Sequence, residues 1–131
     1  MANRAEREWH FQRGDLQAAT HARHEFARYI DAKHAGAKET YDATLIFGEL
    51  VANAVKSARS AVCVELIENE WTSLRVIDDG DCFERAPEST LPPNDAQSGR
   101  GLYLVTKLAR DLDVAVGEHH CEVTAVLPVR S

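Results

Sequence analysis

The sequence predicts an α+β fold, a two-layer sandwich in which helices cover one face of a mixed, mainly antiparallel sheet. Before residue 60, apolar residues recur at spacings of three and four, which is typical of amphipathic helices. After residue 60, apolar and polar residues alternate in two pairs of short segments, which is typical of β-hairpins. With 131 residues, 44% of them hydrophobic, the chain can bury one core, so we expect a single domain over residues 1–131.

The elements predicted before residue 60 are a short strand and two helices. Residues 9–12 form the strand, on a weak pattern. Asp15 is a suitable N-cap for a helix over residues 16–34, and Gly36 stands where that helix should end. A second helix with a denser apolar face is expected over residues 39–58.

The elements predicted after residue 60 are two hairpins, separated by a loop and a helix. Their strands share the alternating apolar pattern and are expected at residues 61–69, 71–78, 112–117 and 121–129. Residues 79–98 contain three of the four prolines and predict a long loop. Residues 100–110 predict a third helix, which begins at a Gly-Arg-Gly sequence.

Composition narrows the class of function. The net charge of −6, without a basic patch, argues against nucleic acid as a partner. No stretch has the roughly 18 apolar residues of a membrane span, and the N-terminus lacks the apolar core of a signal peptide, so we expect a cytoplasmic protein. Cys63, Cys82 and Cys121 are widely spaced and predict no Cys/His metal cluster. The neighbouring His119 and His120 are expected in a turn or at an exposed strand end.

Three motifs carry side chains suited to binding an anion and a metal. Glu49, Asn53 and Lys56 fall within a sector of about 60° on one face of the second helix. Residues 78–80 (Asp-Asp-Gly) follow an apolar strand, and residues 99–101 (Gly-Arg-Gly) begin a helix whose N–H groups can approach an anion. Each motif alone also has an ordinary explanation: a solvated helix face, an Asp-Gly turn and a loop end.

Together, and in this order, the motifs resemble the N, G1 and G2 boxes of the GHKL (histidine kinase-like) ATPase superfamily. The N box is similar to Glu49-Leu-Val-Ala-Asn53-Ala-Val-Lys56, the G1 box to Val76-Ile-Asp78-Asp-Gly80, and the G2 box to Gly99-Arg-Gly101-Leu-Tyr-Leu-Val105. The greatest similarity is to the stand-alone ATPase domains of anti-sigma-factor serine kinases, the RsbW and SpoIIAB type. The resemblance covers about residues 10–128 and implies the same fold, a helical layer over a mixed sheet.

The resemblance implies that ATP and Mg²⁺ bind. It implies that Asn53 coordinates Mg²⁺, that Glu49 is the general base, and that Asp78 accepts a hydrogen bond from the adenine amine. The further residues that it places at the nucleotide are Lys56, Gly80, Gly99, Arg100, Gly101 and Leu102. Residues 84–98 would form the nucleotide lid.

The chain departs from the family pattern at three positions. Cys82 stands where the G1 box usually has its second glycine, and Ser57 stands where the N box often has histidine. Cys121 stands where the family has a threonine near the adenine, and Thr124 is three residues away.

The resemblance implies a serine/threonine protein kinase that phosphorylates a STAS-type anti-anti-sigma antagonist. Such a kinase can also sequester a sigma factor, and its relatives often form homodimers. One alternative is a nucleotide-binding regulatory module that controls its partner by docking, with little or no phosphotransfer. Another is the catalytic domain of a histidine kinase, with His24 as phosphoacceptor. Such a kinase needs its phosphoacceptor in a helical hairpin, but no proline follows His24 and only one predicted helix precedes the ATPase core. Arg23 and Arg28 either contact an acidic partner or are solvated.

The acidic excess is local. Residues 65–95 hold nine acidic and two basic residues, whereas the rest of the chain holds 12 acidic and 13 basic residues. Because a nucleotide is itself anionic, we expect this acidic segment to repel it unless Mg²⁺, Lys56, Arg100 and the glycine-loop N–H groups compensate. The sequence therefore predicts a nucleotide affinity that depends strongly on Mg²⁺.

Overall fold

A computed structural model of the protein describes residues 5–80 and 97–131 and confirms the α+β fold class. The elements, in chain order, are β1 (Ala5–Gln12), α1 (Leu16–Asp31), α2 (Ala37–Ser57), β2 (Ala61–Glu68), β3 (Trp71–Asp78), α3 (Gln97–Leu108), β4 (Asp111–Gly117) and β5 (His120–Arg130). None of the helices in these described parts combines the length and hydropathy that crossing a bilayer requires.

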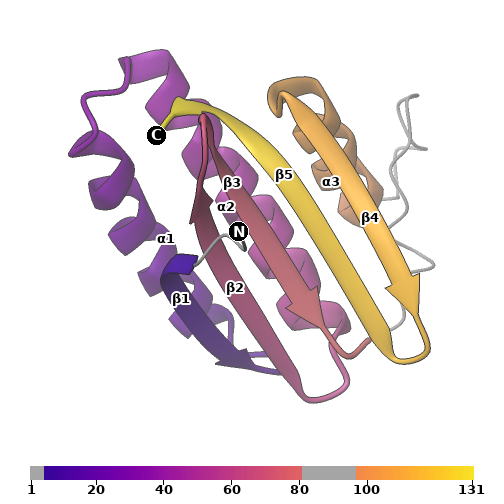
Figure 1. The fold of residues 1–131 in the computed structure, drawn as a ribbon. Coiled ribbons are helices and arrows are strands. Elements are labelled where there is room, and N and C mark those ends of the chain that lie inside the picture. The colour runs from indigo at the N-terminus through magenta and orange to yellow at the C-terminus, as the bar shows by residue number, and fades with distance from the viewer. Residues whose placement is uncertain (1–4, 81–96) are drawn as a thin grey trace.

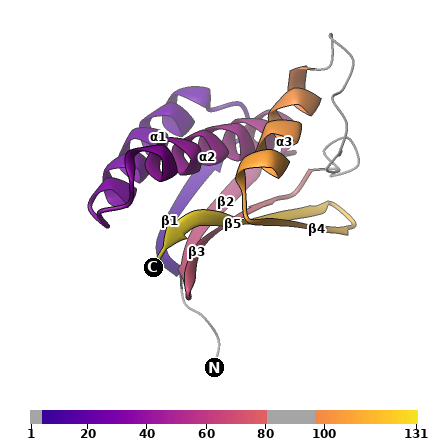
Figure 2. The same cartoon turned by 90° about the horizontal axis from the view of Figure 1, so that it is seen from above.

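The described strands form one five-stranded sheet in the order β1-β2-β3-β5-β4 (Figure 1). All four pairings between these strands are antiparallel, so the expectation of a mixed sheet is wrong for the described strands. The three described helices lie in one layer over one face of the sheet, and none of them lies on the other face (Figure 2). The helix-covered face therefore holds the core, and we refer to the second face as the open face.

The elements lie where the hydrophobic spacing predicts them, with differences at their ends. Strand β1 begins at Ala5, four residues earlier than expected, because its pairing with β2 continues beyond the apolar residues. Helix α3 begins at Gln97 and so includes the last residues of the expected loop. The rest of that loop, from residue 81 to residue 96, lies outside the described residues.

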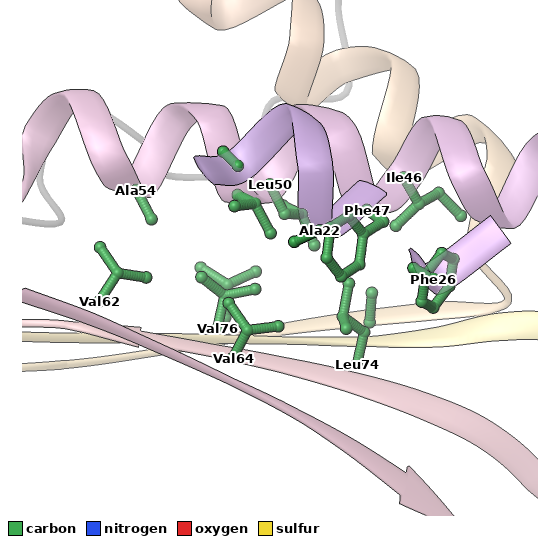
Figure 3. Packing of buried hydrophobic residues seen from close by; sticks show 14 of the residues in the cluster. Ala22, Phe26, Ile46, Phe47, Leu50, Ala54, Val62, Val64, Leu74 and Val76 are labelled. Atoms are coloured by element: carbon green, nitrogen blue, oxygen red, sulfur yellow. The ribbon is translucent and has the colours of Figure 1, made fainter. Parts of the chain in front are cut away.

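Aromatic and branched side chains fill the space between the helices and the sheet (Figure 3). The rings of Phe26 on α1 and Phe47 on α2 stack with centroids 4.5 Å apart. Trp9 on β1 meets Phe47 edge-on at 5.3 Å. Every second residue of β3 is buried, as in a strand with one covered face, so the core face and the open face are clearly separated.

The carboxylate of Glu68, the last residue of β2, fastens α1 to the sheet. It accepts hydrogen bonds from the hydroxyls of Tyr29 at 2.6 Å and Thr72 at 2.7 Å, and it forms an ion pair with Lys33. Partial burial alone would raise the pKa of Glu68, but the hydrogen bonds from Lys33, Tyr29 and Thr72 outweigh burial and lower the pKa to about 2. The negative charge of Glu68 therefore stabilises the fold.

Replacing Glu68 with glutamine is expected to lower the free energy of unfolding by about 2 kcal/mol near neutral pH, because charged hydrogen bonds are lost. The pKa of Glu68 lies below its ordinary value of 4.5, so the contribution of the charge is complete above that value and is lost as the pH falls towards 2. Urea unfolding at several pH values should show that the difference in the free energy of unfolding between Glu68→Gln and the wild type decreases as the pH falls from about 4.5 towards 2. The matched control is Glu70→Gln, at an exposed pair with Arg130, with an effect below about 0.5 kcal/mol. A difference that persisted unchanged at the acid end would contradict the prediction.

Candidate functional site

The carboxylate of Asp78 is buried at the last residue of β3, with 3% exposure. Its Oδ1 accepts a hydrogen bond from the backbone N–H of Gly80 at 2.7 Å, so the following turn orients the carboxylate. The residue opposite Asp78 on β5 is Cys121, which is fully buried on the same face. Thr124 belongs to the alternate residues of β5 that face the open side. The cysteine, and not this threonine, is therefore the neighbour of Asp78.

Gly80 packs against the last residue of α2. A Cβ at Gly80 would lie 2.4 Å from the carbonyl oxygen of Ser57 and 2.9 Å from Oδ1 of Asp78, and both distances are too short for real contacts. A glycine is therefore required here if the end of β3 is to approach the end of α2 this closely. This contact joins two of the predicted motifs.

The side chain of Asp79 stabilises the connection between α2 and β2, a role that the sequence did not predict. Its Oδ1 accepts hydrogen bonds from the backbone N–H groups of Arg59 at 2.9 Å and Ser60 at 3.0 Å, and the Ser60 hydroxyl donates to Oδ2. These hydrogen bonds, led by those from Ser60, lower the pKa of Asp79 to about 2. Asp79 thus holds the connection between α2 and β2, while Asp78 faces the core side.

The polar side chains predicted for α2 lie along its C-terminal half. Glu49 and Asn53 are one turn apart and half-buried, and Lys56 is exposed in the last turn. Ser57, the last residue of this helix, packs against Gly80 in the turn after β3. The C-terminal end of α2 therefore lies close to Asp78, two residues before Gly80. The structure therefore brings the first two motifs to the same end of the molecule.

A groove between α1 and α2 lies beside Glu49. Its volume is about 160 Å³, and its lining residues are Leu16, Ala19, Thr20, Arg23, Gly48, Glu49 and Ala52. The side chain of Arg23 on α1 packs against α2 at Gly48, where there is no side chain. A Cβ at Gly48 would lie 3.1 Å from Cδ of Arg23, which is a tight contact. Arg28 is exposed in the last turn of α1. The sequence did not predict that Arg23 and Glu49 share one groove.

The backbone of Gly99, Arg100 and Gly101 lies in the first turns of α3. A helix start presents backbone N–H groups without intrahelical partners, which suit an anion. Leu102 follows and is buried in the core. Of the expected lid, residues 84–96 lie outside the described residues, as does Cys82, and the remaining two residues belong to α3.

The structure corrects the expectation of one acidic segment facing the nucleotide. Three of its glutamates have cationic partners, in the pairs Glu65–Arg75, Glu68–Lys33 and Glu70–Arg130. Two of these glutamates also lie at the β2–β3 turn, at the other end of the hairpin from Asp78. Among the described acids of the segment, Asp78 and Asp79 alone lie at the candidate site, because the sequence count ignores both pairing and strand direction.

A second cluster of polar side chains lies on the open face. Glu8 and His10 of β1 and Cys63 of β2 bring their ligand atoms within 4.8 Å of one another. The wide spacing of the cysteines along the sequence therefore did not predict that Cys63 lies beside a histidine. No local pattern marks the cluster, because two helices separate β1 from β2 along the chain. His119 does lie in a turn, as expected, with a positive φ of 52°.

The comparisons with known proteins agree with this fold. The sequence matches the family described as the histidine kinase-like ATPase domain over residues 13–127, and no curated protein matches it. A chain in the crystal structure of the SiaB–SiaC complex from Pseudomonas aeruginosa has the same fold, with a TM-score of 0.76 and 15% identity over 95% of this chain and 90% of that chain. The structure of the RsbU and RsbW domains of a Mycobacterium tuberculosis protein matches with a TM-score of 0.62 and 15% identity, over 95% of this chain and 33% of that chain. Since the family match spans most of the sequence, the chain belongs to the family of histidine kinase-like ATPase domains.

Proposed function

We propose that the protein is an ATP-binding anti-sigma regulatory factor that acts as a serine/threonine protein kinase on a STAS-type anti-anti-sigma antagonist. The observation that carries the proposal is the position of Glu49. It is half-buried beside the α1–α2 groove, one turn before Asn53, on the helix that ends against the turn of Asp78. We propose that residues 1–131 work as one such domain, within the cytoplasm.

The residues at the end of β3 fit an adenine nucleotide. The buried carboxylate of Asp78 is a hydrogen-bond acceptor, which favours the exocyclic amine of adenine over a base that presents a carbonyl there. Gly80 keeps the neighbouring surface free of side-chain atoms, at a place where a Cβ has no room. The start of α3, at Gly99 to Gly101, offers backbone N–H groups to the phosphates, and the buried Leu102 anchors this helix in the core.

The polar residues of α2 fit the phosphate end of the same ligand. The amide oxygen of Asn53 is a suitable ligand for Mg²⁺, a hard ion that prefers oxygen. Lys56 and Arg100 supply positive charge for the phosphates. When bound, Mg-ATP supplies a transferable phosphoryl group whose charge the metal partly neutralises. Glu49 would then accept the proton of the attacking hydroxyl.

The groove between α1 and α2 gives an acceptor hydroxyl a route to Glu49. Its lining combines small or apolar residues with Thr20, Arg23 and Glu49, and Arg23 can attract an acidic partner. The structural match to a chain of the SiaB–SiaC complex supports a protein partner, and the match to a structure with an RsbW domain supports the anti-sigma type. A STAS-domain substrate, a bound sigma factor and a homodimer belong to this proposal.

A second candidate function is a regulatory module that binds nucleotide and acts by docking, with little or no phosphotransfer. The observation that favours it is Cys121, because a buried sulfur stands beside Asp78 where the resembling family has a threonine hydroxyl. A cysteine sulfur is a weaker hydrogen-bonding group than a hydroxyl oxygen. The two candidate functions use the same nucleotide site, and they differ in whether the protein transfers phosphate from ATP to its partner.

A phosphotransfer assay separates the two candidates. The protein is incubated with γ-labelled ATP, Mg²⁺ and candidate STAS-domain proteins from the same organism, and calorimetry measures nucleotide binding in parallel. Label on a serine or threonine of the STAS protein is the result expected of the kinase. Nucleotide binding without transfer to any STAS protein tested would favour docking. Absent nucleotide binding would contradict both candidates.

Replacing Asp78 with asparagine is expected to weaken ATP binding about 10- to 100-fold. The amide oxygen can keep the hydrogen bond from the Gly80 N–H, while an NH₂ group faces the adenine amine instead of an acceptor. Titration calorimetry measures the change, with Asp113→Asn, at an exposed position of β4, as the matched control. If Asp78→Asn bound ATP as tightly as the wild type does, Asp78 would not be the residue that recognises adenine.

Removing Mg²⁺ is expected to weaken ATP binding more than about tenfold, because Asp78, Asp79 and Glu49 leave the site with little positive charge of its own. The affinity for ATP is measured with Mg²⁺ and with excess EDTA. Adenosine, which has no phosphates, serves as the control and should bind equally under both conditions. Metal-independent ATP binding would show that Lys56, Arg100 and the backbone suffice.

A further inference from the structure

The open face of the sheet carries three potential metal ligands of different chemistry. Glu8 and His10 lie two residues apart on β1, so both side chains point to the same face. Cys63 is the direct partner of His10 on β2. The side chain of Asp78 lies on the other face, which the helices cover, so the three ligand atoms belong to a different face of the sheet from the proposed adenine contact. Asp78 and Asp79 do line the same hollow as His10 and Cys63, so the two sites are neighbours.

The spacing of the three side chains fits a small tetrahedral ion. The distance between Oε1 of Glu8 and Nε2 of His10 is 3.3 Å. Two ligands that are each about 2.0–2.1 Å from a tetrahedral ion lie about 3.3 Å apart. All three ligand atoms lie within 4.8 Å of one another, so closing around an ion requires the Cys63 sulfur to move by about 1 Å. Side-chain rotation supplies such a movement without a change in the strands.

The surroundings of the cluster favour a cation. Glu8 lies directly opposite Glu65 across the β1–β2 pair, where like charges repel. Glu65 has Arg75 at 2.6 Å, whereas the ionic contact found for Glu8 within the described residues is with the imidazole of His10. His10 and Cys63 also line a hollow of about 260 Å³, which has room for a water molecule as a further ligand.

We propose that Glu8, His10 and Cys63 form a binding site for Zn²⁺ or a similar divalent transition metal, with water as the fourth ligand. A thiolate and an imidazole select such ions over Mg²⁺, so the metal differs from the one proposed for the nucleotide site. Binding replaces the thiol proton of Cys63, which is released to solvent, and no electron is transferred. The ion joins the edge strand β1 to β2.

Metal titrations of the whole, tag-free protein test the proposal, after treatment with a chelator and in the absence of nucleotide. Calorimetry with Zn²⁺ should show saturable binding of one ion, and Mg²⁺ should give no such binding. Co²⁺ serves as a spectroscopic probe, because a thiolate ligand produces a charge-transfer band in the near ultraviolet and a tetrahedral site produces visible bands. Zn²⁺ should also raise the melting temperature.

Ligand variants identify the site. Cys63→Ser should abolish the charge-transfer band, and Cys63→Ser and His10→Ala should each weaken Zn²⁺ binding more than about tenfold. Glu8→Gln is the mildest change and should weaken binding in the same direction. His24→Ala, at an exposed position of α1, is the matched control and should bind Zn²⁺ as the wild type does. Circular dichroism checks that each variant is folded.

Several outcomes would overturn the proposal. One is the absence of saturable Zn²⁺ binding, and another is a Cys63→Ser variant that binds as tightly as the wild type. His119 and His120 also line the hollow, so a His119→Ala/His120→Ala double variant tests them as the actual ligands. Loss of binding in that variant, with binding intact in His10→Ala, would assign the metal to the β4–β5 turn instead.

Discussion

Glutamine in place of Glu49 is expected to slow phosphotransfer to the STAS protein at least about a hundredfold, while ATP affinity stays within about threefold of the wild type. Glutamine has nearly the same size and keeps its place beside the α1–α2 groove. It cannot accept the proton of an attacking hydroxyl at neutral pH. Glu49→Ala should stop transfer as well, because it also removes the base.

The expected separation between binding and transfer follows from where Glu49 lies. Adenine recognition is proposed for Asp78, at the end of β3. The proposed Mg²⁺ ligand is Asn53, one helical turn after Glu49 on α2. Glu49 is directed instead towards the groove that Arg23 shares. Its loss therefore removes an interaction made with the acceptor and leaves those made with the nucleotide.

Labelled ATP in a single-turnover assay measures the transfer, and calorimetry measures the affinity. Glu39→Gln is the matched control, since it makes the same change at a half-buried position near the other end of α2. If Glu49→Gln transferred phosphate at the wild-type rate, Glu49 could not be the general base. A parallel loss of affinity would mean that Glu49 contributes to nucleotide binding rather than to proton transfer.

The helices α1 and α2 are predictable from sequence, because each buries a continuous apolar stripe in one layer. The start of α3 is not predictable in the same way. Gly99 and Gly101 have low helix propensity, so the apolar pattern becomes visible only at Leu102, five residues after Gln97. The N-terminal half of β1 is also hidden, since its outward residues are charged and its pairing with β2 defines it.

The candidate site is only partly predictable, because contacts between distant strands leave no local pattern. The periodicity of β5 shows that Cys121 faces the core, but its position opposite Asp78 depends on β5 pairing with β3 across α3 and β4. The family resemblance supplied that expectation. The cluster of Glu8, His10 and Cys63 depends likewise on the register of β1 against β2, for which no motif exists.

Alanine in place of Gly80 is expected to lower the free energy of unfolding by about 2–3 kcal/mol and to weaken ATP binding more than tenfold. The added Cβ would lie 2.4 Å from the carbonyl oxygen of Ser57, and backbone atoms cannot rotate away. Relief therefore requires the end of β3 to move from the end of α2 by about 1 Å. Asp78 belongs to the first element and Asn53 to the second, so the movement separates the two ends of the proposed nucleotide site.

Gly48→Ala is the matched control, because it makes the same substitution with a different neighbour. Its Cβ would lie 3.1 Å from Cδ of Arg23, a flexible side chain that can shift. Replacing glycine inside a helix then stabilises by about 0.5–1 kcal/mol, so the two variants should change stability in opposite directions. Urea unfolding and ATP titration on both variants test this. If Gly80→Ala kept wild-type stability and affinity, the close contact between β3 and α2 would not be what positions Asp78 for the nucleotide.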